Sequence, residues 1–399
     1  MDIGIFCNER QEVPFLEVSL WPLVNNDFAM IFPKLQRIVI KVGTGILTAG
    51  MGKLHIERIQ SMAEQISILR QQGIEVIVVS SGAIGFGMGL LGHSKRSRHS
   101  DVLRACAALG QPILMETWKA AFNRCGIETA QVLLTRDDVG DRQRHVSLRE
   151  TFEKLIELDS IPIVNENDSI STEEITFIDN DALSALVASF LKAELLVVLS
   201  TIPGLLDLEG DGKLIPVVEK ITPHIRGLAK GTNSPTAVGG MKSKIDAAEI
   251  AIRSGCGVFI TSGEQPDCIA RLIGKENRGT FFVPQSLGLS SKKRWLAFFQ
   301  STEGVVRVNA GAKVALLHKG SSLLARGIVS CKDDFAASSF IAIEDEEGQI
   351  FARGFAQFSS KEITTIAGYK SEEIAHLFPD RKHLEVVHRD EMVMLPLAE

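Results

Sequence analysis

Carboxylates and amides are concentrated between residues 161 and 191, in the stretch IPIVNENDSISTEEITFIDNDALSALVASFL. The stretch begins as an apolar strand and ends as an apolar helix, so its polar residues lie in the connection between two buried elements. The carboxylates are Glu166, Asp168, Glu173, Glu174, Asp179 and Asp181, and the amides are Asn165, Asn167 and Asn180. Groups of this kind can hold a divalent metal ion or position the acceptor of a transferred group.

A lysine and two glycines mark the end of another apolar segment, RIVIKV, at residues 37–42. Lys41 belongs to this segment, where burial of an unpaired ammonium group would be costly. Gly43, Thr44 and Gly45 follow, and glycines allow backbone N–H groups to approach an anion closely. The order of residues is not that of a P-loop, GxxxxGK[ST], and a glycine turn after a strand is more often only a turn. The lysine is therefore the stronger signal for an anion site.

The stretch SSGAIGFGMG, residues 80–89, offers a second set of donors. Ser80 and Ser81 end an apolar strand and can donate or accept hydrogen bonds. Gly82 begins a helix, whose N-terminal N–H groups favour an anion. A plain helix cap explains this stretch equally well.

The third set is AVGGMKSKIDAAEIAI, residues 237–252, where Gly239 and Gly240 precede a helix with Lys242 and Lys244 in its first turn. Cations at this end oppose the helix dipole, and a bound phosphate would remove the conflict. A solvated lysine pair is the alternative. Together the three stretches and the acidic one predict phosphoryl transfer, with cations and amides on the phosphates and carboxylates on a metal ion or the acceptor.

Strands and helices alternate in the part of the chain that carries these residues. Continuous Val, Ile and Leu strands of this kind predict an α/β fold with a parallel sheet covered on both faces. Ligands of such sheets bind at the carboxyl ends of the strands, where the polar residues stand. The expected strands are 37–42, 74–81, 128–135, 161–166, 194–200 and 256–261, and the expected helices are near 55–73, 101–123, 143–159, 181–193, 241–254 and 266–274.

The composition changes at the basic stretch SLGLSSKKRW, after which short β-like segments such as KVALLHKG alternate with glycines. These segments predict a small, mostly β barrel, with helical turns at KEITTIAG and SEEIAHLF. The leading residues show no clean periodicity. The expected organisation is an N-terminal extension at 1–35, a first domain at 36–285, a linker at 286–302 and a second domain at 303–397.

The chain has 399 residues, a net charge of −6, 45% hydrophobic residues and 23% charged residues, which fits two or three globular domains. Its six scattered cysteines include no CxxC or zinc spacing, which favours a reducing compartment. No apolar run reaches the roughly 18 residues of a membrane span, and the N-terminus lacks a signal-peptide pattern. We therefore expect a cytoplasmic protein that does not act in a membrane.

Eight motifs resemble those of the glutamate 5-kinase family, whose members combine an amino acid kinase fold with a C-terminal PUA domain. The motifs are VIKVGTGILT, VVSSGAIGFG, LLTRDD, IPIVNENDSI, IDNDALSAL, GGMKSK, KGSSLL and VVHRDEM, and the resemblance covers residues 37–395. It implies a three-layer parallel-sheet kinase domain followed by a small PUA barrel. The implied activity is transfer of the γ-phosphoryl group of ATP, with Mg²⁺, to the γ-carboxylate of L-glutamate, the first step of proline biosynthesis.

The resemblance also implies roles for individual residues. Ser81, Asp168 and Asn180, with Asn165 beside them, would bind glutamate. Lys41 and Lys244 would neutralise the transferring phosphoryl group, while Asp179 and Asp181 would orient these lysines. The expected ATP-binding residues are Lys41, Gly43, Thr44, Ser200, Thr201, Val238, Gly239, Gly240, Met241, Lys242, Ser243 and Lys244. No protein ligand of the metal is expected, and Glu173 and Glu174 are interpreted as loop residues.

The expected partners follow from the same resemblance. They are L-glutamate and ATP, proline as a feedback inhibitor, glutamyl phosphate reductase as the downstream enzyme, and further copies of the chain in a homo-oligomer. Two positions depart from the family pattern, because Thr201 stands where an aspartate is usual and Val238 where a threonine is usual. Both lie on the nucleotide side, so weaker ATP binding is expected.

Other functions are less well supported. Other amino acid kinases, such as acetylglutamate, aspartate, carbamate and uridylate kinases, share the fold but lack the NEND and DND pairing with a PUA tail. An RNA-binding protein with a degenerate kinase domain is the alternative from another class. Residues 303–399 carry 11 basic and 15 acidic residues, a net charge of −4, whereas RNA binding depends on cations, so RNA is not expected as a partner. A pseudokinase, suggested by Thr201, is disfavoured because the lysines and glutamate-site residues remain.

Overall fold

A computed structural model provides the structure of the chain. It describes residues 35–50, 52–93, 97, 99–135, 138, 142–170, 179–229, 240–270, 278–285, 302–379, 381 and 384–395. Almost all of the expected N-terminal extension and linker lie outside these ranges, as do Glu173, Glu174, Val238 and Gly239. In the described part of the chain, helices lack the combination of length and apolar composition that crossing a bilayer requires.

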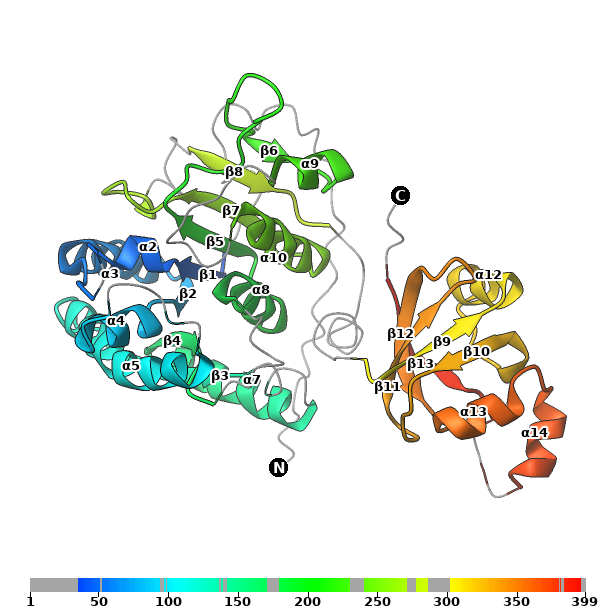
Figure 1. The fold of residues 1–399 in the computed structure, drawn as a ribbon. Helices are drawn as coiled ribbons and strands as arrows, with labels where there is room; N and C mark the ends of the chain where they lie inside the picture. Colours follow the sequence, from blue (N-terminus) through cyan, green and yellow to red (C-terminus); the bar gives the residue numbers. More distant parts are fainter. Residues whose placement is uncertain are drawn as a thin grey trace, which may run out of the picture.

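An eight-stranded sheet forms the centre of the first domain, in the order β3-β4-β2-β1-β5-β7-β8-β6 (Figure 1). All neighbouring strands are parallel except β7 and β8, which confirms the expected parallel sheet. The antiparallel strand β8 was not predicted, because four residues give too short a pattern to assign. The strands are β1 (Arg37–Val42), β2 (Glu75–Ser80), β3 (Thr129–Leu134), β4 (Ile161–Glu166), β5 (Leu195–Ser200), β6 (Val217–Val218), β7 (Gly257–Ser262) and β8 (Gly279–Phe282).

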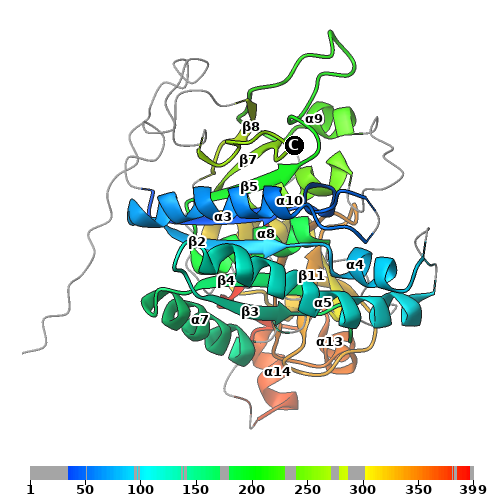
Figure 2. The ribbon, with the colours of Figure 1, turned by 90° about the vertical axis from the view of Figure 1, so that its left-hand side faces the viewer.

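Helices cover both faces of this sheet, and each face has its own apolar core. One core packs α3 and α5 on the sheet, and Figure 2 shows these helices across the near face. The other core packs α7, α8 and α10 on the opposite face. The helices are α2 (Thr44–Leu47), α3 (Ile56–Gln71), α4 (Ala83–Leu90), α5 (Ser100–Asn123), α7 (Arg142–Glu157), α8 (Asn180–Leu191), α9 (Pro223–Leu228) and α10 (Met241–Arg253). The expected helix near 266–274 is wrong at residues 266–269, which form turns.

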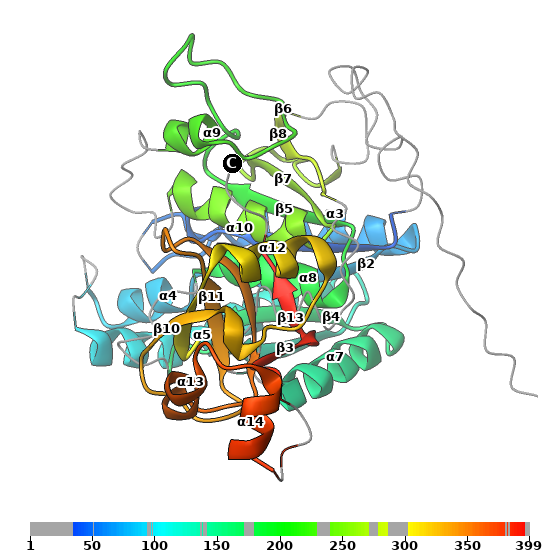
Figure 3. The same ribbon diagram turned by 90° about the vertical axis from the view of Figure 1, so that its right-hand side faces the viewer.

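The second domain contains a five-stranded sheet in the order β10-β9-β11-β12-β13, with three α-helices in the described residues (Figure 3). Its own core is apolar, and two expected helical turns are confirmed as α13 and α14. The elements are β9 (Gly304–Val308), α12 (Ala310–Lys319), β10 (Ile328–Lys332), β11 (Phe340–Glu344), β12 (Ile350–Ala356), α13 (Ser360–Ile366), α14 (Ser371–Leu377) and β13 (Val387–Met394).

The segment KVALLHKG was expected to be β-like and is helical instead, as part of α12. The side chain of Asn309 caps this helix by accepting a hydrogen bond of 2.9 Å from the backbone N–H of Ala312. Gly320 ends it in the left-handed conformation, at φ 58°. These two signals outweigh the short apolar run between them, because a cap and a C-terminal glycine fix both ends of a helix.

Candidate active site

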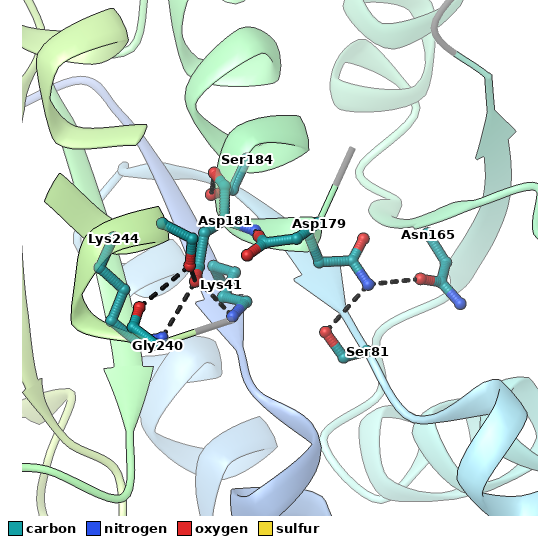
Figure 4. A network of polar contacts seen from close by, with 10 residues as sticks. Lys41, Ser81, Asn165, Asp179, Asp181, Ser184, Gly240 and Lys244 are labelled. Carbon is teal, nitrogen blue, oxygen red and sulfur yellow. Dashed lines mark hydrogen bonds and ion pairs between the residues drawn. The ribbon is translucent and has the colours of Figure 1, made fainter. Parts of the chain in front are cut away.

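Two lysines and one aspartate meet at the carboxyl edge of the first sheet (Figure 4). The Nζ atom of Lys41 lies 2.5 Å from Oδ1 of Asp181, and the Nζ atom of Lys244 lies 2.9 Å from Oδ2 of the same carboxylate. All three residues are buried, with exposed fractions of 5%, 0% and 5% for Lys41, Asp181 and Lys244. The cluster therefore holds two cations on the two oxygens of one carboxylate.

The strand and helix patterns place these residues. Side chains alternate along a strand, so Lys41 shares a face of β1 with Val39, which packs in the core of α8 and α10. Asp181 lies in the first turn of α8, where a carboxylate is favoured by the helix dipole. Lys244 lies at the start of α10, whose N-terminus faces the same edge. Each residue comes from a different element, and the sheet order brings the elements together.

The electrostatics of this cluster favour an anion. Burial raises the pKa of the Asp181 carboxyl, but the charges and hydrogen bonds of Lys41 and Lys244 outweigh that effect and hold the pKa below its ordinary value. The charges of these three buried residues sum to one positive charge, which a bound anion would offset. Helix α10 begins at Gly240 with no side-chain cap and no acidic residue in its first turn, so its N–H groups add to the positive potential.

Asp179 connects this cluster to a second group of polar side chains, and Figure 4 shows it between the two. It caps α8, because one of its carboxylate oxygens accepts a hydrogen bond from the backbone N–H of Asp181. Its other oxygen, Oδ2, is buried and finds no hydrogen-bond partner among the described residues. A buried carboxylate oxygen without a donor requires one, so this atom fits a positively charged or hydrogen-bonding ligand.

The second group consists of amides and a hydroxyl. The Nδ2 atom of Asn180 donates hydrogen bonds of 2.9 Å to Oγ of Ser81 and 2.9 Å to Oδ1 of Asn165. The Oδ1 atom of Asn180 is buried, and no described group donates to it. The structure thus brings together Ser81, Asn165 and Asn180, three of the four expected glutamate-binding residues. Asp168, the fourth, is half-buried in the turn after β4.

Two glutamines extend this group, and the sequence analysis missed both. Asn165 donates through Nδ2 to Oε1 of Gln111 at 2.8 Å, and Gln111 donates through Nε2 to Oε1 of Gln131 at 2.9 Å. Gln111 lies on α5 in line with the buried residues Ala107 and Leu114. A polar residue at a buried helical position was the available signal, since such a group needs a partner.

Glu166 is a further acidic residue of the site to which the sequence analysis gave no role. It ends β4 and is half-buried. Burial, followed by the negative charges of Asp168 and Asp179, raises the pKa of its carboxyl group to about 8. The neutral form of the Glu166 carboxyl group is therefore favoured at pH 7.

The glycine turn after β1 contacts the end of β5. The N–H of Gly43 donates to the carbonyl of Leu199 at 3.2 Å, so it is already paired within the sheet and does not face an anion as expected. A Cβ atom at Gly45 would lie 2.9 Å from Cγ2 of Thr201, so Gly45 permits the close approach of these two segments. Thr44 begins α2 and Ser200 ends β5, which gathers these expected nucleotide-site residues at one place.

The remaining expected nucleotide-site residues belong to the start of α10. Gly240 precedes the helix, Met241 is its first residue and is buried, and Lys242 is exposed. The Oγ atom of Ser243 lies 3.0 Å from Oδ2 of Asp181, so this hydroxyl joins the lysine cluster. In the part of the chain that the structure describes, no group of three or more His, Cys, Asp or Glu residues could hold a metal ion.

Comparisons with known proteins agree with this geometry. Residues 36–262 match the amino acid kinase family, and residues 304–378 match the PUA domain. A protein of Trichlorobacter lovleyi named glutamate 5-kinase is 41% identical over 369 residues, which cover 92% of this chain and 98% of that protein. Proteins of the same name from Caldanaerobacter subterraneus and Moorella thermoacetica are 40% and 38% identical, over 91% and 94% of this chain and 99% and 100% of their own lengths.

Proposed function

This chain belongs to the amino acid kinase family and, within it, to the glutamate 5-kinases, and we propose that it transfers the γ-phosphoryl group of ATP to the γ-carboxylate of L-glutamate. The product is γ-glutamyl phosphate, which commits glutamate to proline biosynthesis. The buried cluster of Lys41, Asp181 and Lys244 is the observation that carries the proposal.

The cluster suits the transfer step because it is a preorganised positive site. A phosphoryl group in transit spreads negative charge over its oxygens, and catalysis consists largely of positioning and charge stabilisation. An ammonium group has three donors, so Lys41 and Lys244 can contact phosphate oxygens while each stays bound to Asp181. The role of Asp181 is then to hold the two lysines in place rather than to react.

The amide group suits the amino acid substrate. Asn180 Oδ1 is a buried acceptor that no described group satisfies, and the α-ammonium group of glutamate carries three donors. Asp168 supplies a carboxylate near the same place, and the Ser81 hydroxyl can donate to a carboxylate oxygen. We therefore assign Ser81, Asn165, Asp168 and Asn180 to glutamate and Asp179 to the boundary between glutamate and phosphate.

The donor set also fits Mg²⁺ that arrives with ATP. This ion keeps several waters and is held by one or two carboxylates plus substrate phosphates rather than by a cage of protein ligands. The buried and unpaired Oδ2 atom of Asp179 is a carboxylate donor of that kind. When bound, the ion supplies charge neutralisation on the phosphates, while Lys41 and Lys244 act on the group that moves.

The nucleotide side of the proposal includes Gly43, Thr44, Ser200 and Thr201 at one place and Gly240 to Lys244 at the other. Thr201 supplies a neutral hydroxyl where the family pattern has an aspartate. We therefore propose that this protein binds ATP with lower affinity than relatives that have the aspartate. An ionised acceptor contributes about 1.5–3 kcal/mol per hydrogen bond, against about 1 for a neutral one.

The wider organisation belongs to the same proposal. Two separate sheets and two family matches support domains at 36–285 and 303–397 with a linker at 286–302. We further propose a cytoplasmic homo-oligomer that is inhibited by proline and supplies glutamyl phosphate reductase, and the acidic second domain gives no reason to add RNA as a partner.

A hydroxamate assay tests the activity, because hydroxylamine traps acyl phosphates. Glutamate, ATP and Mg²⁺ should give hydroxamate, while aspartate and N-acetylglutamate in its place should give little. Product from N-acetylglutamate in preference to glutamate, or no product from glutamate at any concentration, would contradict the proposed substrate.

A further inference from the structure

Five side chains form one continuous chain of hydrogen bonds from the active site to the surface. The chain runs from Ser81 through Asn180, Asn165 and Gln111 to Gln131, with distances of 2.9, 2.9, 2.8 and 2.9 Å in that order. Asn165 and Gln111 are buried, at 1% and 8% exposure, whereas Gln131 is exposed. The buried members cannot exchange partners with bulk water, so each depends on its neighbours in the chain.

The secondary structure explains why these residues meet. Asn165 continues the face of β4 that carries Ile161 and Ile163, which pack in the core of α5. In the register of β3 with β4, Leu133 pairs with Asn165, so Gln131 lies two residues earlier on the same face of β3. Gln111 of α5 lies across these two strands and bridges them.

Each link in the chain has a direction. An amide side chain has an oxygen that accepts and an NH₂ group that donates, so the orientation of one amide determines the orientation of the next. Gln131 accepts from Gln111, Gln111 accepts from Asn165, and Asn165 accepts from Asn180. The NH₂ group of Asn180 is then fully used by Asn165 and Ser81, and its oxygen is left for a ligand.

The opposite direction would give a different site. If Gln131 donated to Gln111, every amide behind it would turn over, and Asn180 would present its NH₂ group where the oxygen is now. An oxygen accepts from an ammonium group, whereas an NH₂ group donates to a carboxylate. The direction of the amide chain therefore decides whether Asn180 binds the ammonium group or a carboxylate group of an amino acid.

We propose that Gln111 and Gln131 are positioning residues that set the direction of this amide chain, so that Asn180 presents its oxygen to the α-ammonium group of the amino acid substrate. The inference rests on the proposed function, because it takes glutamate as the ligand. Gln131 is the end that determines the direction, since it alone of the three residues Gln111, Gln131 and Asn165 is exposed and can exchange donors for acceptors with water.

A matched pair of substitutions at this exposed residue tests the proposal. Gln131→Glu supplies acceptors only and keeps the observed direction, so the KM for glutamate should stay within about twofold of wild type. Gln131→Lys supplies donors only and reverses the chain, so the KM for glutamate should rise by about tenfold or more, the scale of losing a hydrogen bond to a charged group. The KM for ATP and the melting temperature should change little in both variants, which separates positioning from folding.

Two controls remove the effect of charge alone. Glu128→Lys places a positive charge three residues before Gln131, on an exposed side chain that makes no described hydrogen bond to the five residues of the amide chain. It should leave the KM for glutamate unchanged. Glutarate, which is glutamate without its ammonium group, serves as a competitor. Gln131→Lys should raise the KM for glutamate by a larger factor than the Ki for glutarate, whereas general damage to the site would raise both equally.

The outcomes distinguish this inference from the proposed function. If wild type phosphorylates glutamate and the Glu and Lys variants at 131 have equal KM values, the directional role of Gln131 is overturned while the kinase assignment stands. If wild type does not act on glutamate, the kinase assignment fails, and NMR of the ligand-free protein still tests the direction. The side-chain NH₂ resonances of Asn165 and Asn180 should keep their shifts in Gln131→Glu and move in Gln131→Lys; unchanged shifts in both would reject the proposal.

Discussion

Lys41 and Asp181 are 140 residues apart in the sequence, and their side chains are 2.5 Å apart in the structure. Lys41 lies near the end of strand β1 and Asp181 lies in the first turn of α8, both at the carboxyl edge of the sheet. Lys244 occupies the other oxygen of the same carboxylate. This shared carboxylate is the feature from which the first two predictions follow.

Asp181→Asn should destabilise the ligand-free protein, because it removes the carboxylate that two buried ammonium groups contact. Removing one partner of a buried ion pair lowers the free energy of unfolding by about 3–5 kcal/mol. The pKa of Asp181 lies below its ordinary value, so its stabilisation is present above about pH 4 and is lost as the pH falls further. Chemical denaturation measures the free energy of unfolding of both proteins. Asp181→Asn should lower it strongly relative to wild type at pH 7 and less at pH 3.

Lys244→Ala should lower kcat by at least about a hundredfold, the scale of losing one donor to a transition-state oxyanion. Lys242→Ala is the matched control for kcat, because Lys242 belongs to the proposed nucleotide side but is exposed and lies outside the buried cluster. Steady-state kinetics should show a near-normal kcat for the control. Near-normal turnover of Lys244→Ala would remove this lysine from the transfer step.

Gly45→Ala should lower the melting temperature by a few degrees, although alanine favours a helix over glycine by about 1 kcal/mol. The reason is steric, because the new Cβ atom would lie 2.9 Å from Cγ2 of Thr201. Serine lacks that methyl group, so the double variant Gly45→Ala/Thr201→Ser should recover the lost stability. Thermal unfolding of the two single variants and the double variant forms a complete cycle, and additive effects would argue against the contact.

Thr201→Asp should tighten ATP binding by about tenfold, since replacing a neutral acceptor by an ionised one adds about 1.4 kcal/mol, a factor of ten. Titration of ATP and GTP into both proteins measures the effect. Weaker ATP binding in the aspartate variant, together with tight and selective binding in wild type, would show that other contacts hold the nucleotide.

Glu166→Gln should make the stability of the ligand-free protein less dependent on pH. The pKa of Glu166 is about 8 in the folded protein, against 4.5 as its ordinary value, so the folded state retains a proton that the unfolded chain releases. Wild type therefore loses stability as the pH rises from about 4.5 to about 8, and glutamine, which does not ionise, removes this part of the loss.

Melting temperatures at pH 5, 7 and 8.5 check this prediction. The melting temperature of Glu166→Gln should exceed that of wild type by a small amount at pH 5 and by the largest amount at pH 8.5. The melting temperature of Glu128→Gln, a change at an exposed position, should depend on pH as that of wild type does. The same pH dependence for Glu166→Gln would show that the carboxyl group of Glu166 does not titrate in this range.

The sequence by itself determined the α/β architecture and the neighbourhood of the site. Continuous apolar strands alternating with helices require a parallel sheet, and a parallel sheet places all its carboxyl strand ends at one edge. Lys41 and Ser81 follow that rule directly, because each stands at the end of such a strand. Lys244 was predicted from its unfavourable place in a first helical turn, which is a local signal as well.

Only the tertiary structure decided which of these groups touch. The pairing of Lys41 and Lys244 with opposite oxygens of Asp181 depends on the order of strands β1, β2 and β5 and on how α8 and α10 pack across them. Gln111 reaches both Asn165 and Gln131 because α5 crosses β3 and β4 at one particular register. Periodicity shows which face of an element is buried, but it does not specify the element packed against that face, so contacts between distant residues come only from the folded chain.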